Sequence, residues 1–453
     1  MNTHDSNETH NSSSSHNARY QEALHFLFEQ LPMFTRVGAA AYRPDLGNIV
    51  ALCNALGQPH TKFKSIHIAG TNGKGSSSHF LAAIFQAAGY KTGLYTSPHV
   101  VDFRERIRLN GSLIPQEFVI DFVARIQAMS ETLKPSFFEI TVAMAFDFFA
   151  QEGVDIAIIE VGLGGRLDST NIITPEVSLI TQISYDHMNL LGNTLPEIAR
   201  QKAGIIKHGV PVVVSEEQPD IQPVFLAEAL KQKTRVYYAY EQYPILQQYN
   251  GETPGTLTVR YLDAAHTDVL TLTLGAQGEY QAKNAAGVLT VVDILRQQGW
   301  IISPEAVQIG LREVKSRTGL RGRFDWISSN PNIILDVSHN EAGLKALFEQ
   351  CRKIPFAKWW IITGMVQDKD VDAALHHFPR DAYYLFTQAP IPRALPFETL
   401  AEKAKAAGLN GEPVRSVAGA LQKAIHDAQP NDLILVTGSF FILDVAYKYF
   451  GLE

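Results

Sequence analysis

The chain has few cysteines, little net charge and no long apolar run, and each absence excludes a class of protein. Cys53 and Cys351 are the only cysteines among 453 residues, too few and too far apart for a disulfide framework or a cysteine-based metal site. The formal net charge of -7 argues against a nucleic-acid-binding surface. No apolar run reaches the length that crosses a bilayer. We therefore expect a globular enzyme of the reducing cytoplasm, with no membrane or nucleic-acid partner.

The N-terminal residues lack an apolar core as well. Residues 1–18 are rich in Asn, Ser and His, so we expect a disordered tail rather than an export signal. The rest of the chain is too long for one ordinary core. Strands that alternate with helices predict an α/β fold, with a doubly wound, mainly parallel sheet in residues 19–315 and a smaller α/β domain in residues 316–453. Residues 256–274 alternate like strands without a helix between them, which indicates a β-hairpin.

The stretch that carries chemistry most clearly is residues 70–76, with the sequence GTNGKGS. An apolar run precedes it and helix formers follow it, which is typical of a phosphate-binding loop. Glycines such as Gly73 let backbone N–H groups point inward, and the helix N-terminus adds partial positive charge. Lys74 would reach the outer phosphates, and Ser76 would offer its hydroxyl to a metal or a phosphate oxygen. Unlike the common loop, this one has Gly75 between lysine and hydroxyl, and the alternative interpretation is an ordinary strand-to-helix turn.

Polar side chains also follow other predicted strands. Ligands of a parallel sheet gather beyond the carboxyl ends of its strands, where Ser97, Glu160 and His187 fall. Glu160 closes an apolar strand, and beside nucleotide phosphates it would hold Mg²⁺, although it could also be a surface carboxylate just beyond the core. His187 is a weaker candidate because imidazole is an uncommon ligand of Mg²⁺. Lys202 lies on a predicted amphipathic helix, where the residues alone indicate a solvated lysine.

A charged segment, residues 102–108 with the sequence DFRERIR, follows Ser97. One interpretation is a solvated face. The other is a mobile loop that closes over an anionic ligand. The residues leave both open.

The second α/β region has polar groups of its own. Arg323 could neutralise a terminal phosphate. Asp336 and His339 follow a predicted buried strand, and Ser439 opens the last helix, whose N-terminus suits a carboxylate. Each of these residues could also serve only as a cap or turn. Taken together, they predict a cleft between the two domains.

Six ordered motifs resemble the folylpolyglutamate synthase family, a branch of the Mur ligase superfamily. The resemblance covers the chain from about Tyr20 to the C-terminus. The motifs are GTNGKGS at 70–76, TSPH at 96–99, EVGLGGRLD at 160–168, DH at 186–187, QKAG at 201–204 and DVSHN at 336–340.

The resemblance implies a Mur-ligase-like fold with an Mg·ATP domain followed by a glutamate-ligase domain. It implies that Ser97, Glu160 and His187 hold magnesium, and that Lys202 is carbamylated and holds a second ion. It places the nucleotide on the glycine loop and on Asn284, Arg323 and Asp336, and the incoming glutamate near His339 and Ser439. Lys74, Lys202 and His339 are the implied catalytic residues. The implied pterin pocket consists of Asp45, Leu46, Gly47, Ser136, Phe137, Phe138, Glu139, Leu167, Asp168 and Ser169.

The implied reaction is ATP-dependent amide formation. A folate-type carboxylate attacks the γ-phosphate, and the glutamate amine then displaces phosphate from the acyl phosphate. Phe137 and Phe138 suit this substrate because they could stack on a flat ring. The pocket match suggests both dihydropteroate and reduced folates as substrates, and the resemblance implies a monomer. The alternatives are a Mur-type ligase acting on a uridine diphosphate sugar precursor and a P-loop nucleotide switch.

Overall fold

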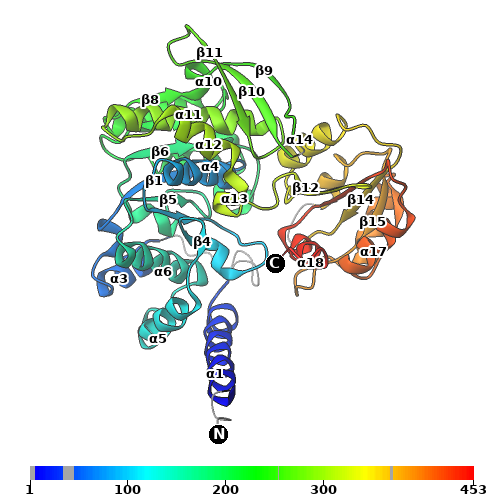
Figure 1. The fold of residues 1–453 in the computed structure, drawn as a ribbon, viewed down its shortest axis with the longest axis horizontal. Coiled ribbons are helices and arrows are strands. Elements are labelled where there is room, and N and C mark those ends of the chain that lie inside the picture. Colours follow the sequence, from blue (N-terminus) through cyan, green and yellow to red (C-terminus); the bar gives the residue numbers. More distant parts are fainter. Residues whose placement is uncertain (1–5, 34–44, 254, 368–370, 453) are drawn as a thin grey trace.

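The chain forms two α/β parts that lie side by side, with a helix at the N-terminus projecting from the first part (Figure 1). This computed structural model describes residues 6–33, 45–253, 255–367 and 371–452. No helix among these residues is long and apolar enough to span a membrane.

The first part is built on an eight-stranded sheet with the order β4-β3-β2-β5-β1-β6-β7-β8. The strands β2, β5, β1, β6, β7 and β8 run parallel, whereas β3 and β4 pair antiparallel at one edge. The strand bounds are β1 Lys64–Ala69, β2 Thr92–Tyr95, β3 Ile107–Leu109, β4 Ser112–Leu113, β5 Ile156–Glu160, β6 Val177–Ile180, β7 Val212–Val214 and β8 Val236–Tyr238.

Helices cover both faces of this sheet because its central strands are apolar on both sides. In β5, Ile156 and Ile158 pack into one cluster with helices α4, α11 and α12, while Ala157 and Ile159 pack into another with α3, α5 and α6. Such two-sided burial is typical of parallel strands. The expected doubly wound fold is therefore confirmed. The helices are α3 Gly47–Ala55, α4 Lys74–Ala87, α5 Gln116–Leu133, α6 Phe137–Glu152, α7 Met188–Leu191, α8 Leu195–Ala203, α9 Gln222–Lys231, α10 Ala239–Gln242, α11 Tyr280–Gln297 and α12 Pro304–Arg312.

A small antiparallel sheet lies at the far end of the first part (Figure 1). Strands β10 (Leu257–Leu262) and β11 (Val269–Leu274) form the expected hairpin. A third strand, β9 (Ile245–Asn250), pairs with β10 and was not expected. Its sequence, ILQQYN, is mostly polar and mostly exposed, so it lacks the alternation that identifies a half-buried strand.

The second part is the smaller α/β domain expected from the sequence. Its sheet has the order β12-β13-β17-β14-β15-β16, in which only β12 pairs antiparallel. Alternate residues of β17 enter two different apolar clusters, so helices cover both faces here too. The elements are β12 Asp325–Ser329, β13 Asn332–Leu335, α14 Glu341–Cys351, β14 Trp359–Thr363, α15 Val371–Leu375, β15 Tyr383–Phe386, α16 Phe397–Ala406, β16 Asn410–Pro413, α17 Val417–Asp427, β17 Leu433–Thr437 and α18 Phe440–Tyr449.

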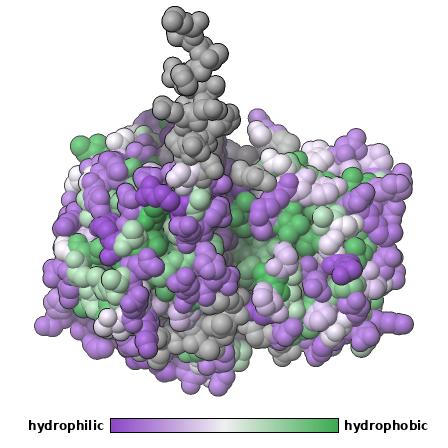
Figure 2. Space-filling view, turned by 90° about the horizontal axis from the view of Figure 1, so that it is seen from below, coloured by the Kyte–Doolittle hydropathy of each residue, from purple (hydrophilic) through white to green (hydrophobic). Residues whose placement is uncertain are grey.

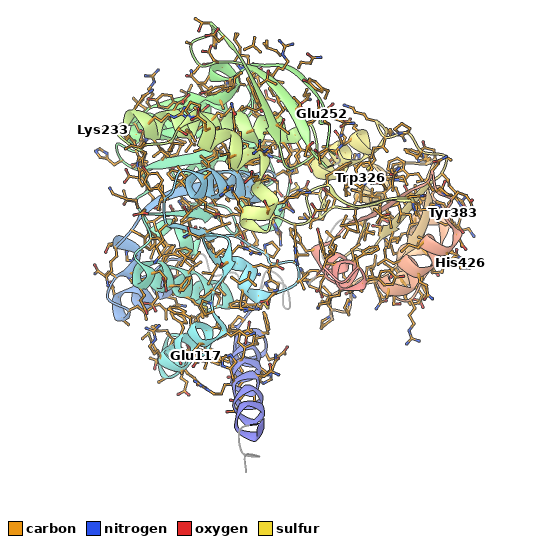
Figure 3. All side chains as sticks on the ribbon, in the orientation of Figure 1. Glu117, Lys233, Glu252, Trp326, Tyr383 and His426 are labelled. Atoms are coloured by element: carbon orange, nitrogen blue, oxygen red, sulfur yellow. The ribbon has the colours of Figure 1, made fainter. Side chains whose placement is uncertain are left out.

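Two expected boundaries look different in the structure. The helix α1 spans Ser6–His25, so most of the expected tail is helical, while residues 1–5 lie outside the described residues. Arg19 pairs with Glu117 on α5 at 3.4 Å, and Figure 3 shows Glu117 on the side of α5 that faces α1. This contact anchors a helix that then continues through the polar residues.

The proposed domain boundary at residue 315 falls within the short helix α13 (Val314–Thr318), which leads into β12.

Candidate active site between the two α/β parts

A cavity of about 560 Å³ lies where the two parts meet. The space-filling view shows the surface hollowed between the two halves, with hydrophobic side chains gathered beside the hollow (Figure 2). The cavity lies beyond the carboxyl ends of the parallel strands, as the fold requires. Its lining contains every site residue expected from the sequence except Asp45, Leu46 and Gly47.

The glycine loop joins β1 to α4 and forms the floor of the cavity. Gly73 has a φ of 91°, and a Cβ atom there would lie 2.3 Å from Oδ1 of Asn284, so only glycine fits. The ammonium of Lys74 donates to the carbonyls of Gly70 at 3.0 Å and Thr71 at 3.1 Å, which curls the lysine over the loop. Burial lowers its pKa, and Glu160 opposes that shift. The loop and the start of α4 thus present a cation and backbone N–H groups to the cavity.

The extra glycine of the loop has a structural reason. A Cβ atom at Gly75 would lie 3.1 Å from Nη2 of Arg323 and 3.9 Å from Oε1 of Glu160. Arg323 comes from the second part of the chain, just before β12, and Glu160 ends β5. Gly75 therefore leaves room for a cation and a carboxylate from other elements beside Lys74.

The expected magnesium ligands differ in how well they fit. Glu160 is 4% exposed, and its carboxylate accepts from the backbone N–H of Ser97 at 3.2 Å. Burial raises its pKa, while Lys74 and Arg323 oppose that shift. His187 has a left-handed backbone with φ 50°, and its Nε2 lies 3.9 Å from Oδ1 of Asp186. No group of three or more His, Cys, Asp or Glu side chains within the described residues could hold a metal by itself. A carboxylate with a nearby hydroxyl does suit Mg²⁺ that takes its other ligands from phosphates and water.

Lys202 is not the solvated lysine that its helix pattern indicated. Its side chain is 4% exposed, and its ammonium donates to the carbonyl of Gly70 at 2.8 Å. Burial, together with the nearby Lys74, lowers its pKa to about 7. Lys202 lies on the buried face of α8, four residues after Ile198, while Glu197 and Arg200 on the other face are exposed. Gly165 packs so closely that a Cβ atom there would lie 2.8 Å from the carbonyl oxygen of Gln201.

The two phenylalanines of the expected ring pocket play different roles. Phe137 is 3% exposed and stacks on Phe28 at a centroid distance of 5.6 Å, with Arg106 5.1 Å from its ring. Its ring is therefore already packed on one side, although Phe137 also lines the cavity, and its stacking on a substrate stays a prediction. Phe138 is only partly buried and lies against Gly162, where a Cβ atom would be 2.4 Å from its ring. Phe138 is thus the ring that a flat ligand can reach.

Other residues of the expected ring pocket hold the backbone in place. Ser136 and Glu139 form a capping box at the start of α6, and the Glu139 carboxylate also accepts from Asn48 at 3.4 Å. Asp168 accepts from the backbone N–H of Leu163 at 2.8 Å, and burial raises its pKa. Leu167 and Ser169 also line the cavity.

Asp45 lies outside the cavity lining. Its carboxylate accepts from the backbone N–H of Gly47 at 2.8 Å, at the start of α3. Leu46 packs against the apolar cluster behind Phe138. The binding role expected for these three residues stays a prediction.

The second part supplies the opposite wall. Asp336 is 2% exposed and accepts from the backbone N–H groups of Phe324 and Ser338, both at 2.8 Å. His339 contacts the Val337 carbonyl through Nδ1 at 2.9 Å, and its Nε2 lies 3.7 Å from Oδ2 of Asp186.

Two further wall residues were expected from the sequence. Ser439 caps α18 by accepting from the Phe441 N–H at 3.2 Å, so it is at least a cap. Asn284 donates to Gln281 at 3.0 Å, and Gln281 donates to Ser76 at 3.2 Å, which joins α11 to the glycine loop.

A direct link between the two parts was missed by the sequence reasoning. The amides of Asn72 and Asn340 pair in both directions, at 3.3 Å and 3.0 Å, across 268 positions of sequence. Asn340 also donates to Oδ2 of Asp186 at 3.2 Å and caps α14 by accepting from the Gly343 N–H at 2.9 Å. Both asparagines lie inside recognised motifs, yet their spacing says nothing about their pairing. This network ties the glycine loop to the second part.

Comparisons with known proteins agree with this geometry. Residues 68–292 match the Mur ligase middle domain, and residues 322–440 match the glutamate ligase domain of Mur ligases. The dihydrofolate synthase/folylpolyglutamate synthase of Bacillus subtilis is 32% identical over 415 residues, which is 89% of this chain and 94% of the relative. The protein of the same name from Escherichia coli is 34% identical over 382 residues, which is 82% of this chain and 83% of the relative.

Solved structures agree along almost the whole chain. E. coli FolC in complex with DHPP and ADP matches with a TM-score of 0.82 at 29% identity, covering 95% of this chain and 97% of that chain. Mycobacterium tuberculosis folylpolyglutamate synthase complexed with ADP and AMPPCP matches with a TM-score of 0.84 at 29% identity, covering 97% of this chain and 99% of that chain. The likeness therefore includes both α/β parts.

Proposed function

The chain belongs to the dihydrofolate synthase/folylpolyglutamate synthase family of Mur ligases, and we propose that it uses ATP to join L-glutamate to dihydropteroate and to reduced folates. The observation that carries this proposal is the convergence of Lys74, Glu160 and Arg323 around Gly75, next to a pocket walled by Phe138. Two cations beside a helix N-terminus suit the phosphates of ATP. The partly buried ring of Phe138 beside them suits a pterin or aminobenzoyl group.

The reaction needs no nucleophilic side chain because the folate carboxylate is the nucleophile. It attacks the γ-phosphorus of ATP, which yields an acyl phosphate and ADP. The amine of glutamate then attacks the acyl carbon, loses a proton, and phosphate leaves. Lys74 and Arg323 neutralise the charge on the transferred phosphoryl group, and the cavity aligns the reactants. His339 and Ser439, in the wall formed by the second part, are the residues we assign to the incoming glutamate.

We assign the primary magnesium ion to Glu160 and Ser97, with His187 as a third contributor. When bound, magnesium would offset phosphate charge and orient the nucleotide. A second ion is proposed at Lys202 if the lysine carries a carbamate. The buried position of Lys202 and its pKa of about 7 support that modification, because carbamate formation requires the neutral amine.

Two rival functions predict different substrates. A Mur-type ligase would need space for a uridine diphosphate sugar, whereas the surface offered by Phe138 and Gly162 is apolar and flat. A nucleotide switch would need no binding site in the second part, yet Asp336 and His339 from that part line the cavity.

We also propose that the enzyme acts as a monomer in the cytoplasm, where its free cysteines Cys53 and Cys351 would stay reduced.

The test is ADP release with dihydropteroate and with tetrahydrofolate, each with and without glutamate, and with mass spectrometry of the products. A ligase releases ADP only when glutamate and a folate-type acid are both present, and its product gains one glutamyl residue. ADP release at the same rate with and without glutamate would favour the nucleotide switch. Turnover of a uridine diphosphate sugar acid, with none of the folates, would favour the Mur-type alternative.

A further inference from the structure

The charged segment at residues 102–108 is neither a solvated face nor a simple loop. It forms a short 3₁₀ helix, η4 (Phe103–Arg106), followed by strand β3. Arg106 is 4% exposed, yet it belongs to the lining of the cavity. A guanidinium that is removed from water needs an anion or a full set of acceptors to offset the loss of hydration.

Arg106 has no carboxylate partner within the described residues. Its Nε donates to Nδ1 of His99 at 2.8 Å, and its guanidinium lies over the ring of Phe137. His99 accepts this hydrogen bond at Nδ1, so it offers Arg106 a lone pair and no countercharge. Tyr95, Glu105 and Glu160 also act on Arg106 and raise its pKa, but burial has the largest effect and lowers it.

The carboxylates near Arg106 in sequence are already occupied. Asp102 holds Arg104 at 2.7 Å. Glu105 accepts from the backbone N–H groups of Val100 and Val101, at 2.7 Å and 3.1 Å. Within the part of the chain that the structure describes, Arg106 therefore forms no ion pair, and Glu105 and Glu160 act on it only at longer range.

The position of Arg106 relates the ring pocket to the reaction centre. Its backbone carbonyl accepts from the N–H of Thr96 at 3.0 Å, which fixes Arg106 beside the strand end that carries Ser97. Its guanidinium contacts Phe137, the neighbour of Phe138 in the ring pocket. A folate with its ring at Phe138 and its reacting carboxylate near Glu160 would therefore carry its glutamyl tail past Arg106.

We propose that Arg106 binds the α-carboxylate of the glutamyl tail of reduced folates, the carboxylate that does not react. The inference rests on the proposed function. The reacting γ-carboxylate belongs to the centre formed by Lys74 and Arg323, so a second cation suits the second carboxylate of the same tail. A guanidinium can hold a carboxylate with two parallel hydrogen bonds. Dihydropteroate has only the carboxylate that reacts, so Arg106 would act in chain extension and not in addition of the first glutamate.

The test compares tetrahydrofolate with an analogue in which 4-aminobutyrate replaces the glutamyl residue. The analogue keeps the reacting carboxylate and lacks the α-carboxylate. The wild-type enzyme should favour tetrahydrofolate by about 10- to 100-fold in kcat/KM, mostly through KM, because a charged hydrogen-bonded contact is worth about that much. This arm needs no variant, so it does not depend on whether a substituted protein folds.

The second arm uses Arg106→Gln and Arg106→Lys. Both should remove the preference, so that the ratio of kcat/KM for tetrahydrofolate to kcat/KM for the analogue falls toward one. Lysine should fail because it keeps the charge and loses the planar fork. Arg104→Gln is the matched control, since Arg104 lies on the same short helix and already pairs with Asp102. Circular dichroism and melting curves report on folding.

Three results would overturn the inference. A wild-type enzyme that uses both substrates equally has no α-carboxylate contact. Variants that retain the preference place the contact elsewhere. Variants that lose activity equally with all three acids show that Arg106 only packs the wall. A wild-type protein that releases no ADP with any of these acids would instead refute the proposed function.

Discussion

We expect that replacing Lys202 with Met stabilises the protein and abolishes its activity. The Lys202 ammonium is buried beside Lys74, and its pKa is lowered to about 7. A lysine in an unfolded chain titrates near pH ~10.4. At pH 6 both states carry the proton, so the difference of roughly 3.4 pH units lowers the free energy of unfolding by about 5 kcal/mol. Methionine removes that cost and fills a similar volume.

The pH dependence has a definite sign. Between pH ~7 and pH ~10.4 the unfolded lysine binds a proton that the folded lysine does not, so wild-type stability rises with pH by about 1.4 kcal/mol per pH unit. The methionine variant lacks this contribution. Its advantage should therefore shrink from about 5 kcal/mol at pH 6 to about 2 kcal/mol at pH 9.

The assay is urea unfolding of both proteins at the two pH values in buffer free of carbon dioxide. The control is Lys231→Met, because the Lys231 side chain is 71% exposed and its replacement should change stability little at either pH. A Lys202→Met protein that is less stable than the wild type at pH 6 would refute the reasoning. An advantage that is the same at both pH values would refute it as well.

Activity separates burial from carbamylation. If Lys202 carries a carbamate, added bicarbonate should raise wild-type activity, and a small carboxylic acid should partly restore Lys202→Ala. A fully active alanine variant would contradict the carbamate and the second metal. It would leave untouched the ATP site at Lys74 and Glu160, which has separate geometric support.

Three further predictions concern the same cavity. Lys74→Ala should lower kcat by about 100-fold or more, because one lost contact to the transferring phosphate costs roughly 3 kcal/mol, and Lys74→Arg should not restore it; normal turnover at saturating ATP would refute the role. Glu160→Gln should keep the fold and raise the magnesium concentration needed for half-maximal rate. If the dependence of the rate on magnesium is unchanged, Glu160 has only a structural role. Asn72→Ala and Asn340→Ala should each raise KM for ATP, and the double variant should cost less than the sum of the two; strictly additive effects would show that the pair is not coupled.

The α/β fold could be predicted from the sequence because its decisive features are local. Residues 156–159 of β5 are apolar throughout, and burial on both faces requires that composition. The glycine loop was recognisable for a similar reason, since its residues are adjacent and its backbone geometry is set by glycine. Strand β9 was not recognisable, because an exposed edge strand needs no alternation of apolar residues.

The site was less predictable where function depends on what covers a residue. Lys202 appeared solvated because lysine is normally exposed, although its spacing from Ile198 places it on the buried face of α8. Phe137 and Phe138 are adjacent and alike in sequence, yet Phe28 and Arg106 occupy the first and leave the second accessible. Arg106 itself was one of several charges in a short segment. Only tertiary packing distinguishes a buried cation from its exposed neighbours.

The departure of the glycine loop from the common pattern connects ATP chemistry to the second α/β part. At Gly75 a Cβ atom would lie only 3.1 Å from Nη2 of Arg323, so glycine leaves room beside the loop for a cation from the second part of the chain. The Asn72–Asn340 pair joins the same loop to the same part of the chain. The phosphate site is therefore complete only when both parts are in contact. The second part also supplies the wall where we place glutamate. Contact between the two parts would therefore complete the nucleotide site and the glutamate site at the same time. We expect phosphoryl transfer to occur only in this state, in which glutamate can react with the acyl phosphate.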